Sequence, residues 1–140
     1  MSGDGEVEIL LRRLATWAMG RSDVRGLALV GSWARGQPQP HSDVDLVLLS
    51  AEPAQYVEHD EWVAELDPAR LVRTASWGAI TERRFALPSG VEVDLGVGSP
   101  AWASINPIDP GTRRVVEDGV RILHDPDGAL AQLVARVRET

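Results

Sequence analysis

Two aspartates at alternate positions of an otherwise apolar segment are the residues best suited to chemistry in this 140-residue sequence. Asp43 and Asp45 belong to DVDLVLL, which is typical of a buried β-strand. Residues two apart in a strand point to the same face, so both carboxylates should project together while Val44 and Leu46 enter the core. Carboxylates this close repel each other unless a cation intervenes, and Mg²⁺ suits such oxygen ligands. Two aspartates at this spacing also occur in exposed turns. The magnesium site that they suggest therefore needs support from other residues.

A glycine and a serine precede the acidic pair. Gly31 and Ser32 follow a short apolar strand predicted over residues 25–30, and ten residues separate Ser32 from Asp43. A glycine at a strand end lets the backbone approach a ligand closely, and a serine hydroxyl with nearby amides can hold phosphate oxygens. Arg35, one helical turn beyond Ser32, adds a donor of charge-assisted hydrogen bonds. Taken alone, these residues also fit an ordinary turn with a surface arginine.

A third carboxylate is predicted on the later strand VEVDLGV, residues 91–97. Its valines and leucine alternate on one face, so Glu92 and Asp94 share the other. If this strand pairs beside residues 43–49, Asp94 joins the acidic pair, while Glu92 is expected to make a salt bridge with a neighbouring arginine. Three carboxylates on adjacent strands, opposite a turn that holds phosphate, predict a two-metal site for phosphoryl transfer.

The elements that must position these residues alternate along the chain. Helical spacing of apolar residues predicts a helix over 7–18 and a helical stretch over 53–66, closed by Asp67-Pro68. Pro88-Ser89-Gly90 predicts a hairpin turn, and Arg83 and Arg84 just before it are expected on a solvated face. The remaining elements are strands at 71–77, 82–87, 91–97 and 120–124, and helices at 112–118 and after Asp125. Together they predict an α+β fold, one mixed β-sheet flanked by helices, in a single domain over residues 1–140.

Composition narrows the class of protein and of partner. Hydrophobic residues make up 44% of the chain and charged residues 25%, which is typical of a globular protein. The formal net charge of −7 makes nucleic acid an unexpected partner. The lack of cysteine excludes disulfides, thiolate metal sites and a cysteine nucleophile. The N-terminus does not resemble a signal peptide, and no apolar run reaches the roughly 20 residues that span a bilayer, so we expect a cytoplasmic protein without a membrane partner.

The combined pattern resembles the nucleotidyltransferase superfamily of the DNA polymerase β type. It consists of Gly31-Ser32, ten residues, Asp43-Val44-Asp45, and Asp94 on a later strand. Within the superfamily, GSWARG and SDVDLVLL are most similar to the minimal nucleotidyltransferases and to the catalytic domain of aminoglycoside nucleotidyltransferases. The resemblance covers residues 25–98. Each motif is weak by itself, whereas their spaced combination is specific.

The resemblance implies a nucleotidyltransferase fold and a role for each matching residue. Asp43 and Asp45 would bind two Mg²⁺ ions, and Asp94 would complete the site where the acceptor hydroxyl loses its proton. The residues expected to hold the nucleoside triphosphate are Gly31, Ser32, Arg35 and Ser42. The implied reaction is attack of the acceptor oxygen on the α-phosphorus, with release of pyrophosphate. ATP is the expected nucleotide by family likeness.

The sequence leaves several alternatives open for the acceptor. Aminoglycoside enzymes carry a C-terminal helical domain that binds the acceptor, for which this sequence leaves no room after Asp94. Minimal family members are often paired with a small helical protein of the HEPN type, which they adenylylate as its antitoxin. The alternatives are a homo-oligomeric enzyme that modifies an aminoglycoside-type antibiotic, and a non-catalytic protein that binds a partner through the same fold.

Overall fold

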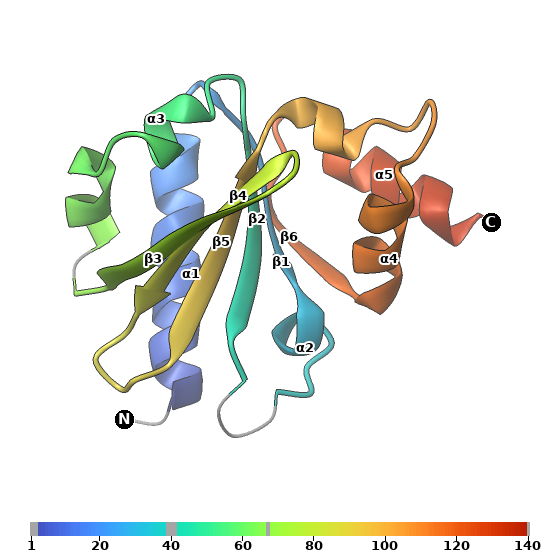
Figure 1. Ribbon diagram of the computed structural model, residues 1–140. Coiled ribbons are helices and arrows are strands. Elements are labelled where there is room, and N and C mark those ends of the chain that lie inside the picture. The colour runs from blue at the N-terminus through green and yellow to red at the C-terminus, as the bar shows by residue number, and fades with distance from the viewer. Residues whose placement is uncertain (1–2, 39–41, 67, 140) are drawn as a thin grey trace.

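The computed structural model describes residues 3–38, 42–66 and 68–139. In this part of the chain, six strands form one mixed sheet in the order β3-β4-β5-β2-β1-β6 (Figure 1). The strands are β1 (Val24–Val30), β2 (Val44–Ser50), β3 (Arg70–Trp77), β4 (Ile80–Ala86), β5 (Glu92–Gly98) and β6 (Val120–His124). The helical elements are α1 (Gly3–Met19), α2 (Gly31–Ala34), α3 (Ala54–Val57), η1 (Glu61–Leu66), η2 (Pro100–Ala103), α4 (Pro110–Asp118) and α5 (Ala129–Arg138). The predicted α+β class, a mixed sheet flanked by helices, is confirmed.

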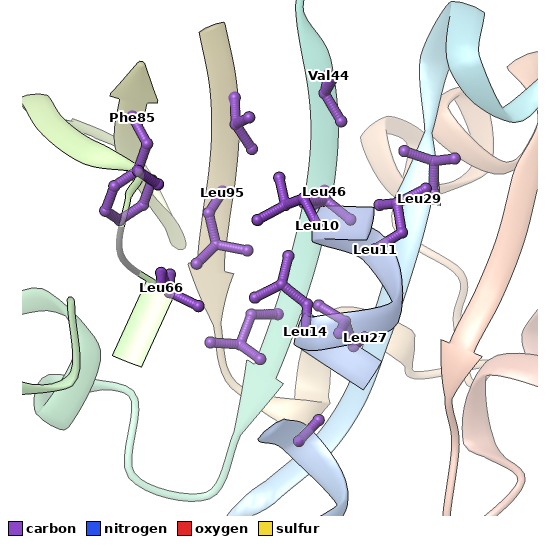
Figure 2. Close-up of a cluster of buried hydrophobic side chains, with 14 of the residues drawn as sticks. Leu10, Leu11, Leu14, Leu27, Leu29, Val44, Leu46, Leu66, Phe85 and Leu95 are labelled. Carbon is purple, nitrogen blue, oxygen red and sulfur yellow. The ribbon is translucent and has the colours of Figure 1, made fainter. Parts of the chain in front are cut away.

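Helix α1 covers one face of the sheet (Figure 1). Its leucines recur at helical spacing, and Leu10 and Leu14 are at most 5% exposed. Figure 2 shows them among side chains from the strands, including Leu46 of β2 and Leu95 of β5. Burial of each leucine contributes about 1.5–3 kcal/mol, so this layer holds β2 and β5 in place from one side. Neither α1 nor any other helix of the described residues is long and apolar enough to cross a membrane.

The opposite face is covered over only part of the sheet. A second apolar cluster joins Val116 of α4 to Val30 of β1 and Val47 of β2, and its buried strand residues all come from β1 and β2. Figure 1 shows α4 and α5 on the β1–β6 side of the sheet, away from β3. At the far edge, Trp77 of β3 is 66% exposed. Asp45 lies two residues before Val47 and therefore points to this half-covered face.

Strand β2 lies between an antiparallel neighbour, β1, and a parallel neighbour, β5. The β2–β5 register sets Asp45 opposite Asp94 and Leu46 opposite Leu95. Strand β5 pairs with β4 in an antiparallel hairpin around the predicted turn at residues 88–90. Because side chains alternate between faces, this register brings both aspartates to the same side of the sheet.

The helical stretch predicted over residues 53–66 is interrupted between α3 and η1. Arg83 of β4, 2% exposed, reaches into this gap. Its Nη1 donates a hydrogen bond to the Val57 carbonyl at 2.5 Å, and its Nη2 pairs with Asp60. The solvated face expected for Arg83 is therefore wrong. A buried guanidinium needs hydrogen-bond partners, and the end of α3 and the segment before η1 provide them. Asp67, expected to close the stretch, lies outside the described residues.

Candidate active site

Four side chains lie in one row across the half-covered face of the sheet. Asp45 of β2 is opposite Asp94 of β5, Asp94 is opposite Arg84 of β4, and Arg84 is opposite Arg73 of β3. Side chains directly opposite each other on neighbouring strands are in contact range, with Cβ atoms about 4.5–5.5 Å apart. We call this set the polar row. It places two carboxylates beside two guanidinium groups on a rigid sheet.

Gly31 brings the end of β1 against the first member of the polar row. Val30 is paired with Asp45, and α2 begins at the next residue. Gly31 has φ +74°, a conformation that L side chains rarely adopt. A Cβ atom built on it would lie 2.8 Å from Oδ2 of Asp45. Glycine is therefore required here twice, by its backbone conformation and by the carboxylate beside it.

Arg84 bridges the carboxylates that surround it. Its Nη2 donates to Asp94 Oδ2 at 2.8 Å, and its Nη1 lies 2.8 Å from Glu92 Oε1 and 3.3 Å from Asp43 Oδ2. Its Nε lies 3.8 Å from Glu82 Oε1. The side chain is only 17% exposed, so the solvated face expected for Arg84 is wrong. The salt bridge expected between Glu92 and a neighbouring arginine is confirmed.

The sequence nevertheless contains a signal for Arg84. The hairpin turn is centred on Ser89, and counting five residues outward in each direction pairs Arg84 with Asp94, as the structure shows. A turn prediction therefore also predicts the residue that faces a candidate carboxylate. Without the turn, the sequence predicts an exposed side chain for Arg84, because arginine is mostly exposed in proteins.

Arg35, a predicted phosphate ligand, does not lie among the carboxylates. Its Nη1 donates a hydrogen bond to the carbonyl of Asp118 at 3.0 Å, at the end of α4. A Cβ atom at Gly119 would lie 2.9 Å from Cγ of Arg35. In this structure Arg35 therefore connects the segment after α2 to the end of α4.

Ser32 and Ser42 lie on either side of the connection between β1 and β2. Both are partly exposed, Ser32 within α2 and Ser42 next to Asp43. The Ser42 carbonyl accepts a hydrogen bond from Nε1 of Trp33 at 3.3 Å. This bond fastens the segment before Asp43 to α2. His41, expected to be a solvated turn residue, lies outside the described residues.

A carboxylate pair beside a glycine turn has a counterpart among known protein families. The family model described as a nucleotidyltransferase domain matches residues 11–122, which contain the whole polar row and Gly31. The chain belongs to the nucleotidyltransferase family. A comparison with curated proteins finds no match. The family match confirms the superfamily that the sequence motifs resemble, and it shows an enzyme of nucleotidyl transfer.

The carboxylates of this nucleotidyltransferase domain fit a hard divalent cation, although they do not already surround one position. Within the described ranges, no three carboxylate or imidazole side chains are arranged as ligands of a single ion. Oδ1 of Asp94 is buried and has no hydrogen-bond partner among the same residues. A buried carboxylate oxygen without a donor is unfavourable, and a cation would satisfy it. The oxygen-only donor set is the one that Mg²⁺ prefers.

The two opposed aspartates of the nucleotidyltransferase site hold protons more tightly than exposed aspartates do. Burial, followed by the charge of Glu82, raises the pKa of Asp94 to about 6. Burial, followed by the charge of Asp43, also raises the pKa of Asp45. Removal from water disfavours the charged form of a carboxyl, and neighbouring negative charges act in the same direction. A bound cation would lower the pKa of both carboxyls, so the site favours one.

The raised pKa of Asp94 predicts a pH-dependent stability of the metal-free protein. The folded-state pKa of about 6 lies above the ordinary value of 3.8, so between these values the folded chain binds more protons than the unfolded chain. The contribution of Asp94 to the free energy of unfolding should therefore fall as the pH rises from about 4 to 6 and then level off. Urea unfolding in EDTA, at a series of pH values, should show Asp94→Asn gaining stability relative to wild type across this window.

The matched control for this prediction is Asp127→Asn. The hydrogen bond from Arg25 lowers the pKa of Asp127, so its titration lies below the window and the stability difference from wild type should stay constant there. An equally constant difference for Asp94→Asn would contradict the prediction.

Proposed function

We propose that this chain, as a single cytoplasmic nucleotidyltransferase domain, transfers a nucleoside monophosphate to a hydroxyl acceptor in a Mg²⁺-dependent reaction. AMP from ATP is the proposed group. The observation that carries the proposal is the β2–β5 register, which sets Asp45 opposite Asp94 beside the Gly31 turn. Two Mg²⁺ ions held by Asp43, Asp45 and Asp94 would supply positive charge to the phosphates.

The residues around Gly31 are proposed to bind the triphosphate. Gly31 has no side chain to keep phosphate oxygens from the end of β1, and Ser32 and Ser42 are partly exposed residues. Both hydroxyls can donate hydrogen bonds to phosphate. Arg35 would join them by leaving the Asp118 carbonyl, to which its Nη1 now donates.

In the proposed reaction the acceptor hydroxyl releases its proton to solvent at the site that Asp94 completes, its oxygen forms a bond with the α-phosphorus, the bond to the bridging oxygen of the β-phosphate breaks, and pyrophosphate leaves. Such chemistry depends mainly on positioning and charge neutralisation. Asp94 would position the acceptor through the cation that it helps to hold, because its Oδ1 has no hydrogen-bond partner among the described residues and a cation would satisfy it.

We propose a protein acceptor, a small helical partner of the HEPN type to which this chain is the antitoxin. The open part of the half-covered face supports a large acceptor. Ile80 of β4 lies over Gly96 and Gly98 of β5, with its Cδ1 only 2.6 Å from the position of a Cβ on Gly98. Trp77, paired with Ile80, is 66% exposed. The exposed Trp77 beside the partly buried Ile80 gives this edge of the sheet an apolar surface that a protein partner could contact.

The test is transfer of label from α-³²P-labelled ATP, GTP, CTP and UTP. The purified chain is incubated with each, with and without Mg²⁺, together with the protein encoded by the adjacent gene or with a panel of aminoglycosides. We expect label from ATP on the partner protein, and none without Mg²⁺. Label on an aminoglycoside would favour the antibiotic-modifying enzyme acting as a homo-oligomer.

Two other outcomes would contradict the proposal. Neutralisation of the partner that survives Asp43→Asn combined with Asp45→Asn would favour a non-catalytic binding protein. Failure of the folded chain to transfer label to any acceptor, together with failure to bind any triphosphate, would exclude nucleotidyl transfer by this chain acting without a further component.

A further inference from the structure

Arg84 occupies the centre of a carboxylate cluster to which the proposed function assigns divalent cations. Its two terminal nitrogens contact Asp43, Glu92 and Asp94 at 2.8–3.3 Å. Two of these three partners, Asp43 and Asp94, are the proposed metal ligands. A guanidinium therefore contacts the same carboxylates that a divalent cation would need.

The strand pairing holds Arg84 in this place. Arg84 and Asp94 are directly opposite each other in the β4–β5 hairpin, and the Arg84 and Asp94 side chains are only 17% and 15% exposed. Nε of Arg84 and Oδ1 of Asp94 are both buried without hydrogen-bond partners in the part of the chain that the structure describes. The ion pair between Arg84 and Asp94 thus balances charge in the cluster, while one polar atom of each side chain has no hydrogen-bond partner.

The other guanidinium of the polar row differs in its surroundings. Arg73 pairs with Glu82 at 3.0 Å and its side chain is 55% exposed. Among the described residues, the ion-pair partner of Arg73 is Glu82, which is not a proposed metal ligand. Arg73 therefore offers a matched control, an arginine on the same face and in the same row but one strand further from the carboxylates.

We infer that Arg84 is a built-in counter-ion of the carboxylate cluster, so that a divalent metal binds by displacing its guanidinium. The inference rests on the proposed function. Metal alone must break the contacts of Arg84 with Asp43 and Asp94, so it binds weakly. A triphosphate brings negative charge that the displaced guanidinium can pair with, so metal and nucleotide bind cooperatively. Arg84 is thus a positioning residue that keeps the cluster assembled and makes metal binding depend on nucleotide.

The test measures Mn²⁺ binding without nucleotide, by electron paramagnetic resonance and calorimetry. Arg84→Gln should bind Mn²⁺ at least about tenfold more tightly than wild type, which corresponds to about 1.4 kcal/mol. Arg84→Lys, which keeps the charge, should bind as weakly as wild type, and so should Arg73→Gln. In EDTA the melting temperature of Arg84→Gln should fall, because the carboxylates then repel each other, and Mn²⁺ should restore it more than it raises that of wild type.

Equal Mn²⁺ affinity of folded Arg84→Gln and wild type would overturn the inference. If Arg84→Gln does not fold, ¹⁵N-labelled arginine in wild type supplies the decisive measurement. The Nε–Hε signal of Arg84, assigned by its loss in Arg84→Lys, should shift on titration with Mg²⁺ and ATP, whereas an unmoved signal at saturation would overturn the inference. The Mn²⁺ measurement contains no nucleotide, so it tests the inference separately from the proposed function. If Arg84→Gln binds Mn²⁺ more tightly than wild type but wild type binds no triphosphate, the proposed function is contradicted and the inference is not.

Discussion

Replacing Asp45 with asparagine is expected to abolish Mg²⁺-dependent triphosphate binding while the fold is retained. Asp45 lies opposite Asp94 and against Gly31, so it joins the proposed metal site to the proposed phosphate site. An amide has one oxygen in place of two and no charge, which makes it a poor ligand for a hard cation. We expect the dissociation constant of Mg·ATP to rise by at least about a hundredfold, or about 2.7 kcal/mol.

Calorimetric titration of ATP, with and without Mg²⁺, into wild type and Asp45→Asn measures this effect. Burial raises the pKa of Asp45, so removing its charge should not weaken the fold, and circular dichroism and the melting temperature check this point. Asp127→Asn, which removes an exposed carboxylate paired with Arg25, should bind Mg·ATP as wild type does. Undiminished binding by Asp45→Asn would show that this carboxylate is not part of a nucleotide site.

Replacing Gly31 with alanine should abolish the same binding by displacing the Asp45 carboxylate. The added Cβ would lie 2.8 Å from Oδ2 of Asp45, and the side chain must rotate away to relieve the overlap. An L residue with positive φ costs about 1–2 kcal/mol in addition. The variant should therefore unfold at lower urea concentration and should lose Mg²⁺-dependent ATP binding in calorimetry.

Gly36→Ala separates backbone strain from displacement of the carboxylate. Gly36 has φ +72°, nearly that of Gly31, but no atom lies within 4 Å of its Cβ position. Both variants should lose stability through backbone strain, Gly31→Ala more than Gly36→Ala because of its overlap with Asp45, whereas only Gly31→Ala should lose ATP binding. If Gly36→Ala abolished binding equally, strain in the turn would be the cause and the close approach to Asp45 would not matter.

The architecture could be predicted largely because its elements carry local signals. Alternation in DVDLVLL and VEVDLGV places the aspartates on one face of each strand, and the turn at residues 88–90 fixes the hairpin that contains Asp94. These signals need only spacing and residue type, which the sequence contains. That the two strands lie side by side is a condition of the sequence prediction, and the structure shows that they pair in parallel.

The burial of the two neighbouring arginines, and their contacts outside the β4–β5 hairpin, could not be predicted in the same way. Arg83 donates a hydrogen bond to the Val57 carbonyl at the end of α3, and Arg84 bridges carboxylates of β5 and the carboxylate of Asp43, just before β2. The pairing of Arg84 with Asp94 follows from the hairpin turn, whereas Val57, Asp60 and Asp43 are distant in sequence from these arginines. The position of Arg35 against the end of α4 has the same origin.

The parallel pairing of β2 with β5 also determines when the chain becomes able to act. Parallel strands cannot be joined by a tight turn, and here residues 51–91, with all of β3 and β4, lie between them. Contacts between such distant segments form late, because the loop between them must be closed first. By this argument we expect Asp45 and Asp94 to come together after the antiparallel β1–β2 and β4–β5 pairings, whose strands are closer in sequence. A chain in which these two strands have not yet paired would lack the pair of opposed carboxylates.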